Sequence, residues 1–192
     1  GQGAEFGDTG SASDVSDRAL LAVANAYTGR GPRTELTELL CTLHGCRSAA
    51  ELLEQASRGG ERSRSAAPTV LRAAESGDEV AADIVRWAGT ELGDSALLAA
   101  RTLGMTGGTF ALVLAGGLFR GESTLLLDTL AARVHAEAPG AQLVQLDTAP
   151  VAGAALMALD MTAAGVDAAA AHRLRTGLLD AVRARAGAAP PG

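Results

Sequence analysis

Aromatic residues are scarce in this sequence: they make up 3% of its 192 positions, although hydrophobic residues reach 47%. Much of the hydrophobic content is alanine, a strong helix former, rather than β-branched residues. The scarcity of rings excludes a core built on aromatic packing. A chain of this length can still bury a sizeable core, so we expect a helix-rich fold held together by small side chains in closely packed helices.

Basic residues and long apolar runs are also few. The chain has 16 Lys and Arg against 22 Asp and Glu, a formal net charge of −6. Nucleic-acid binding takes most of its affinity from a basic surface, so this balance argues against a nucleic-acid partner. No apolar run reaches the roughly 20 residues of a membrane-spanning helix, and no signal-peptide pattern is present. We expect a cytoplasmic protein with no membrane partner.

Cysteine is limited to Cys41 and Cys46, with four residues between them. No second cysteine pair and no nearby His–Glu cluster completes a metal-ligand set. The simpler interpretation is two reduced cysteines, with Cys41 packed in the core, and the alternatives are a disulfide or a metal site. We predict no metal ligands in this chain.

Helical periodicity is the main pattern of the first hundred residues. Ser11, Ser13 and Asp14 can cap a first helix, and Ser48 with Glu51 forms the sequence pattern of a capping box. The predicted helices cover about 14–28, 34–43, 48–57, 67–76 and 78–103, and residues 58–65 form a Gly/Ser-rich loop that we expect to be flexible.

The longest predicted helix, 78–103, has two features of its own. Its apolar side is predicted to run from Val80 through Trp87 to Ala99 and Leu103. Gly89 and Gly93 each cost about 1 kcal/mol of helix stability relative to alanine. At i, i+4 spacing the two glycines lie on the same side of the helix, where they would let another element approach closely.

After residue 104 the pattern changes to that of an α/β fold. Residues 110–115 and 142–147 are short apolar runs bounded by turn residues, as in buried parallel strands. Helices are predicted at 122–137 and from Pro150 to about 161, which gives a βαβα unit at 110–161. A last alanine-rich helix is predicted at 166–187. The fold class we expect is α/β with a large share of helix.

Three glycine-containing stretches are candidate ligand-binding loops. Gly116-Gly117 follows the first strand, at the strand end where ligands of α/β sheets bind, and lacks the Cβ atoms that would keep a ring or phosphate from the backbone. Pro150-Val-Ala-Gly-Ala-Ala155 follows the second strand. Gly7-Asp-Thr-Gly-Ser11 holds a carboxylate, Asp8, suited to sugar hydroxyls. Each of the three is also explained by packing or by a simple helix start.

Several such stretches follow one another in a definite order. They are Gly1-Gln-Gly3, Gly7-Asp-Thr-Gly-Ser11, residues 29–40, Ala74-Glu-Ser-Gly-Asp78, the Gly-Gly-Leu-Phe turn at 116–119 and the Pro150 stretch. This ordered combination resembles the family that groups N-acetylglucosamine kinase with the BadF/BadG/BcrA/BcrD-type ATPases, in the actin/Hsp70/sugar-kinase superfamily. The resemblance spans about residues 1–160.

The resemblance implies a fold and its domain limits. Residues 1–162 would form an incomplete RNase H-like, actin-like ATPase C-terminal lobe, and residues 163–192 its C-terminal helix and frayed tail. The lobe that precedes it in the family carries the Asp-x-Gly-x-Thr phosphate loop and, in sugar kinases, the general base. We therefore expect no catalytic residue in this chain, and expect the chain alone to be inactive. An uncovered sheet edge would favour association, for example as a homodimer.

The resemblance also implies ligands, with ATP and Mg²⁺ as cofactors and a small sugar as substrate. The residues that it places at adenosine are Gly116 and Gly117, with Leu118 and Phe119 near the base, and the Ala73 to Gly77 region on the other side. The residues that it places at the sugar are Asp8, Gly1, Gln2 and Gly3.

Departures from the family pattern leave the function open. Thr9 replaces a glutamate, Gln2 replaces a tryptophan, and Ser13 and Asp14 replace an aromatic pair. The first hypothesis is one lobe of an ATP-dependent N-acetylglucosamine kinase-like enzyme. The second is a non-catalytic binding or dimerisation lobe. The third is an ATPase activator of the acyl-CoA dehydratase type, for which Cys41 and Cys46 are a poor match.

Overall fold

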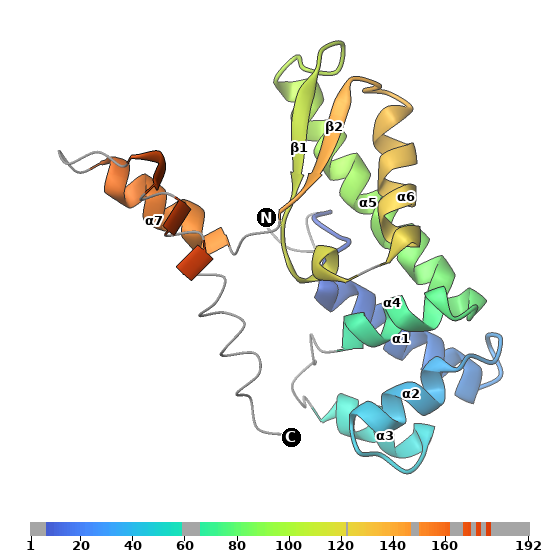
Figure 1. Ribbon diagram of the computed structural model, residues 1–192. Coiled ribbons are helices and arrows are strands. Elements are labelled where there is room, and N and C mark those ends of the chain that lie inside the picture. Colours follow the sequence, from blue (N-terminus) through green and yellow to red (C-terminus); the bar gives the residue numbers. More distant parts are fainter. Residues whose placement is uncertain are drawn as a thin grey trace. The chain divides into compact units, whose positions relative to one another are not determined.

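The computed structural model describes residues 7–58, 66–121, 123–146 and 150–161, together with 167–169, 172–173 and 176–177 (Figure 1). The chain divides into two compact units. The larger comprises Gly1–Leu112 and Gly116–Leu143, and the smaller comprises Val113–Ala115 and Val144–Gly192.

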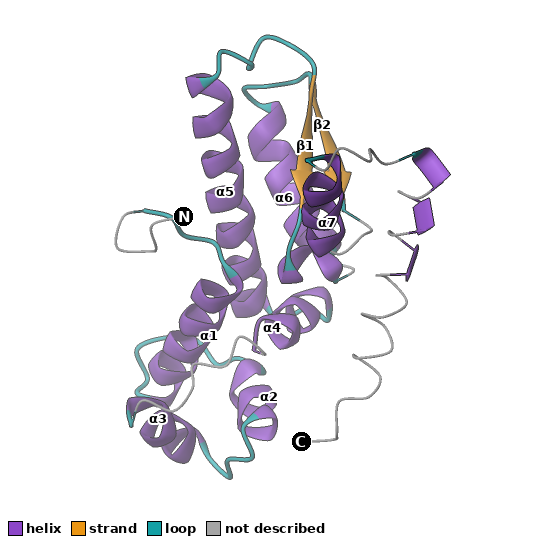
Figure 2. Cartoon of the chain, turned by 90° about the vertical axis from the view of Figure 1, so that its left-hand side faces the viewer, coloured by secondary structure: helices purple, strands orange, loops and turns teal. Residues whose placement is uncertain are grey.

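The larger unit is mainly helical, as the alanine-rich composition predicts. Its elements are α1 (Ala12–Tyr27), α2 (Leu36–Leu43), α3 (Ala49–Ser57), α4 (Ala66–Glu75), α5 (Glu79–Thr102), the 3₁₀ helix η2 (Gly117–Arg120) and α6 (Thr124–His135). All the predicted helices of this region are confirmed, with ends shifted by a few residues. Helices α1 and α4 pack against α5, α2 and α3 pack on α1 and on each other, and α6 runs beside α5 (Figures 1 and 2).

Helix starts follow the polar residues that precede them. Ser11 caps α1 in a complete capping box, because its hydroxyl accepts from Asp14 N while the Asp14 carboxylate accepts from Ser11 N. Ser48 caps α3 in the same way through Glu51 N. The other bond of the predicted capping box, from Ser48 N to the Glu51 carboxylate, is wrong. The Glu51 carboxylate instead accepts from Arg47 N at 2.9 Å. Arg47 also forms an ion pair with Glu51, which draws the carboxylate to that residue.

Asp78 joins the starts of two helices. Its carboxylate accepts from Ala81 N at 2.8 Å, which caps α5. The same carboxylate accepts from the Thr34 hydroxyl at 2.8 Å and from Glu35 N at 2.6 Å, just before α2. A single side chain therefore fixes the beginning of α2 against the beginning of α5.

Small residues on α5 allow α6 to pack closely against it. A Cβ atom added at Gly89 would lie 2.9 Å from Thr129 Cβ and 3.0 Å from Leu126 O, and one at Gly93 would lie 2.9 Å from Arg133 Cγ. The close approach expected from these two glycines is confirmed. Salt bridges from Asp94 to Arg133 and from Arg101 to Glu137 flank the contact.

The predicted apolar side of α5 is wrong at its C-terminal end. Leu103 is 70% exposed and Ala99 is exposed. The buried face is instead made mostly of alanine and glycine, and at Gly89 and Gly93 an added Cβ atom would already crowd α6. The buried residues of α5 are Ala81, Ala82, Ile84, Val85, Ala88, Gly89, Gly93, Leu97 and Ala100.

A two-stranded parallel sheet pairs β1 (Phe110–Leu114) with β2 (Ala141–Gln145), and α7 (Pro150–Asp160) follows. Both strands begin in the larger unit and end in the smaller, where Leu146 N donates to Leu114 O at 2.9 Å. The predicted βαβα order is confirmed and the fold is helix-rich α/β. The RNase H-like arrangement and the domain limits stay predictions. Residues 59–65 and most of the predicted last helix lie outside the described residues.

Candidate functional site

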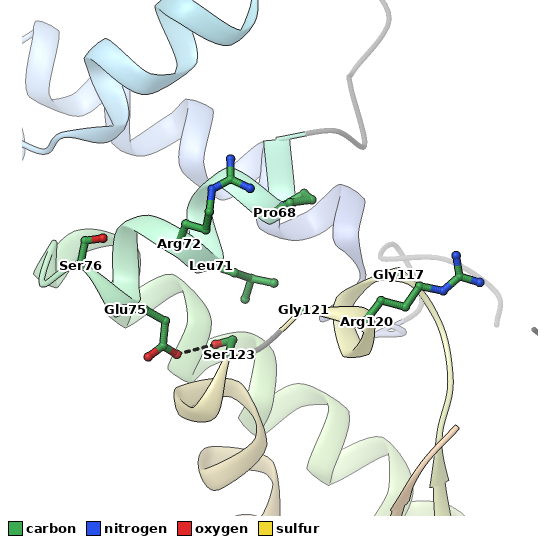
Figure 3. A pocket seen from close by; sticks show the side chains of 9 residues that line it. All are labelled: Pro68, Leu71, Arg72, Glu75, Ser76, Gly117, Arg120, Gly121 and Ser123. Atoms are coloured by element: carbon green, nitrogen blue, oxygen red, sulfur yellow. Dashed lines mark hydrogen bonds between the residues drawn. The ribbon is translucent and has the colours of Figure 1, made fainter. Parts of the chain in front are cut away.

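A pocket of about 660 Å³ lies in the larger unit, between α4 and the segment that joins η2 to α6 (Figure 3). Its volume is within the ~300–1,000 Å³ typical of small-molecule sites. The residues that line it are Pro68, Leu71, Arg72, Glu75, Ser76, Gly117, Arg120, Gly121 and Ser123. Two stretches far apart in the sequence therefore form one concave site.

The first wall is one side of α4. Pro68, Leu71, Arg72 and Glu75 recur at helical spacing, so they share a face. The opposite face, which includes Val70 and Ala74, is buried in the core. Since the core holds α4 by that face, the pocket side of the helix keeps a fixed position.

The second wall is the Gly116-Gly117 turn and the 3₁₀ helix that follows it. Gly116 has a φ of 120°, a conformation that favours glycine because a Cβ atom would be strained there. A Cβ atom added at Gly117 would meet nothing within 4 Å, so the backbone there is open to a ligand. Leu118 is buried in the core cluster and anchors the turn from behind.

Glu75 connects the two walls. Its Oε1 atom accepts from the Ser123 hydroxyl at 2.9 Å and from Leu125 N at 3.1 Å. Its Oε2 atom accepts from the Thr124 hydroxyl at 3.3 Å. The Ser123 hydroxyl in turn caps α6 at Leu126 N. The hydrogen bond from Leu125 N, followed by that from Ser123, lowers the pKa of Glu75, so Glu75 is a carboxylate at neutral pH beside a helix N-terminus that favours negative charge.

Two arginines give the pocket positive charge. Arg72 extends from α4 and Arg120 from η2 (Figure 3). Arg72 donates to the Thr69 hydroxyl at 3.2 Å. Leu71 and Pro68 supply the apolar part of the lining. The site thus combines an apolar surface, open glycine backbone and two guanidinium groups.

The Gly7-Asp-Thr-Gly-Ser11 loop lies against the middle of α5. Gly10 is buried with a φ of 94°, and a Cβ atom there would lie 3.1 Å from both Glu91 Cβ and Leu92 Cγ. The Thr9 hydroxyl donates to the Glu91 carboxylate. Asp8, beside these two anchors, is exposed. The predicted sugar-contacting partners Gly1, Gln2 and Gly3 lie outside the described residues.

Of the residues predicted at adenosine, Gly117 lines the pocket and Gly116 precedes it. Leu118 and Phe119 pack with the core, and Ala73 is 3% exposed in α4. Gly77, with a φ of 102°, ends the turn after α4 next to the pocket residue Ser76. The structure therefore brings the 73–77 and 116–119 segments together, and what each residue contacts stays a prediction.

Arg72, Arg120 and Ser123 line the pocket but were not among the predicted site residues. The spacing of Pro68, Leu71, Arg72 and Glu75 was the available signal for the α4 wall, since these residues recur at i, i+3, i+4 and i+7. No comparable signal pointed to Arg120 or to the bond between Glu75 and Ser123.

The cysteines are not joined to each other: both are free, with Cys41 buried and Cys46 half-buried. Burial raises the pKa of the Cys41 thiol, and the Cys46 thiol donates to the Gln55 side chain. Among the residues that the structure describes, no three His, Cys, Asp or Glu side chains come together as a metal site.

Comparison with known proteins gives a family. The chain's residues 1–158, out of 192, match the family model for the BadF/BadG/BcrA/BcrD ATPase family. A search of individually curated proteins found no match. Within the described ranges, no helix has both the length and the apolar character needed to cross a membrane. The matched span contains both walls of the pocket and the Asp8 loop, and the chain belongs to the BadF/BadG/BcrA/BcrD ATPase family.

Proposed function

We propose that the pocket between α4 and the Gly117 turn holds the nucleoside part of ATP, the substrate that the family name implies. The observation that supports this most strongly is that the end of α4 and the Gly-Gly turn, distant in sequence, line one pocket of ligand size. Both segments lie in the span that matches the family.

The lining suits a nucleoside. A purine base has two flat faces that need apolar or backbone surface, which Leu71, Pro68 and the open backbone at Gly117 supply. Arg72 and Arg120 complement the negative charge of a nucleotide. ATP supplies the transferable phosphoryl group when it is bound. Mg²⁺ normally accompanies ATP, and we propose no ligands for it among the described residues.

The finer proposal is a kinase that phosphorylates a small sugar such as N-acetylglucosamine, with Asp8 as a hydroxyl-contacting carboxylate. What supports it is the exposure of Asp8 on a loop that Gly10 and Thr9 hold against α5. An ATPase activator of the acyl-CoA dehydratase type is the alternative within the same family. A homodimer and a cytoplasmic location belong to the same proposal.

Calorimetric titration of the chain with ATP tests the nucleotide site. The informative variant is Gly117→Val, whose side chain would enter the pocket from a position with no neighbouring atoms. We expect it to fold normally and to weaken ATP binding by about tenfold or more, the effect of a displaced ligand. Gly107→Val, at another exposed glycine with nothing within 4 Å, is the matched control and should leave binding unchanged. Equal ATP affinity in both variants would show that ATP does not bind in this pocket.

Sugar phosphorylation is tested separately. In an assay of ATP-dependent phosphorylation of N-acetylglucosamine by the protein that contains this chain, Asp8→Asn should raise the KM for the sugar. ATP affinity should stay the same, because Asp8 lies in a different loop from the pocket. ATP hydrolysis that is independent of any sugar, and unchanged by Asp8→Asn, would favour the activator alternative.

A further inference from the structure

One residue of the pocket lining stands apart, because its hydrogen bonds cross from one wall to the other. Glu75 is the last residue of α4, and its carboxylate receives hydrogen bonds from Ser123, Thr124 and Leu125 at the start of α6. Figure 3 shows its side chain turned toward Ser123. Arg72 on the same helix instead bonds within its own turn, to Thr69.

These bonds fix the turn that carries Gly117. Ser123 lies three positions after Arg120, the last residue of η2, so a bond that holds Ser123 restrains the chain close to that end of η2. Leu118 restrains the same segment from the core side. Glu75 therefore joins the end of α4 to the start of α6, shortly after the turn that carries Gly117.

Glu75 is poorly suited to contact the ligand as a proton acceptor. Both of its oxygens already accept hydrogen bonds from α6 and its cap. The hydrogen bonds also stabilise its charged form, which makes it a weak base. Its role must therefore be exerted through the residues that it holds.

We infer that Glu75 is a positioning residue of the nucleotide site, which locks the α4 wall to the Gly117 wall and thereby sets the affinity for ATP. The inference rests on the proposed nucleotide pocket. Glu75 would then do more than cap a helix. The affinity for ATP would depend on its hydrogen bonds to the start of α6, although Glu75 itself does not contact ATP.

The chain offers a matched control in Asp78. Its carboxylate also receives three hydrogen bonds that join two elements, from Thr34, Glu35 and Ala81. Asp78 lies three positions after Glu75 in the sequence but does not line the pocket. Removing either carboxylate breaks a link between helices. Only the loss of the Glu75 carboxylate should weaken ATP binding.

The test compares Glu75→Ala, Glu75→Gln and Asp78→Ala by calorimetric titration with ATP, with circular dichroism to confirm that each is folded. We expect Glu75→Ala to weaken ATP binding by about tenfold, as expected for a misplaced binding group. Glu75→Gln keeps an acceptor oxygen and should recover part of that loss. Asp78→Ala should bind within about twofold of the unmodified chain, the scatter of independent sites. Equal losses in Glu75→Ala and Asp78→Ala, or no loss in Glu75→Ala, would overturn the inference.

Amide hydrogen exchange without ligand separates this inference from the proposed function. Glu75→Ala should speed exchange at Leu125 and through residues 117–121, whereas Asp78→Ala should not. If the unmodified chain binds no ATP, the proposed function is wrong and the effect on ATP affinity goes with it, and the exchange pattern then decides whether Glu75 locks the two walls together. Unchanged exchange at 117–121 in Glu75→Ala would refute it.

Discussion

The Glu75 carboxylate accepts a hydrogen bond from the Ser123 hydroxyl at 2.9 Å, across 48 positions of sequence. Ser123 is 4% exposed and is itself the N-cap of α6. The pair connects a helix of the N-terminal helical region to the α/β region that follows. It also lies in the lining of the one pocket described above, so a structural bond and a candidate ligand site share the same residues.

The contribution of Glu75 to stability should depend on pH. Its pKa is lowered in the folded chain from an ordinary value of 4.5. A lowered folded pKa gives stability that is fully present above 4.5 and is lost as the pH falls toward the folded pKa. Urea unfolding of the unmodified chain and of Glu75→Gln should therefore differ at pH 7, by at most about 1 kcal/mol for so exposed a group.

The same comparison at lower pH is its control. As the pH falls below 4.5 and on through the lowered folded pKa of Glu75, its carboxylate becomes protonated and resembles glutamine, so the difference between the two proteins should shrink. The other charged side chains that line the same pocket are those of Arg72 and Arg120. A difference that is constant from pH 7 to pH 3 would show that the charge of Glu75 does not stabilise the fold.

Replacing Gly89 by alanine should destabilise the protein even though alanine favours helices. The added Cβ would lie 2.9 Å from Thr129 Cβ and 3.0 Å from the backbone oxygen of Leu126, so α6 would have to move. We expect a loss of about 1–3 kcal/mol in urea unfolding, as for other overpacked sites. Ser95→Ala, at an exposed position of the same helix, should change stability by less than about 0.5 kcal/mol. A gain in stability for Gly89→Ala would contradict the close packing of α5 and α6.

Two glycines of the Asp8 loop should respond differently to alanine. Both have a positive φ, 80° at Gly7 and 94° at Gly10, so each substitution carries a strain of about 1–2 kcal/mol. A Cβ at Gly7 meets nothing within 4 Å, whereas one at Gly10 approaches Glu91, Leu92 and Ala88 of α5. Thermal unfolding should show a larger loss for Gly10→Ala than for Gly7→Ala, and equal losses would mean that the loop is not seated on α5.

Local patterns in the sequence predicted the helices well because their causes are local. Capping by Ser11 and Asp14, the spacing of Gly89 and Gly93, and the apolar run at 110–114 all act over a few residues. The glycine turn at Gly116 could be expected for the same reason, since a positive φ after a strand favours that residue. The resemblance then placed this turn and the end of α4 on two sides of one ligand.

Relations between distant residues could not be predicted in this way. Glu75 reads as an ordinary solvated acid on a helix end, and Ser123 as a helix cap, and no pattern in either stretch reveals their bond. Leu103 was predicted to be buried from its periodicity, and it is exposed. The spacing of Gly89 and Gly93 predicted that some element approaches α5 closely, but not that this element is α6. Which face of a helix is buried depends on the element that packs against it, and a local sequence pattern does not contain this information.

ATP binding in the pocket between α4 and the Gly117 turn is the central proposal. Amide hydrogen exchange of the chain with and without saturating Mg²⁺-ATP measures this directly. We predict slower exchange in residues 68–76 and 117–126, the two walls of the pocket, and no change in α2 and α3 (Leu36–Leu43 and Ala49–Ser57). Protection in α2 and α3 without protection of both walls, or no protection at all, would contradict the assignment of this pocket to the nucleotide.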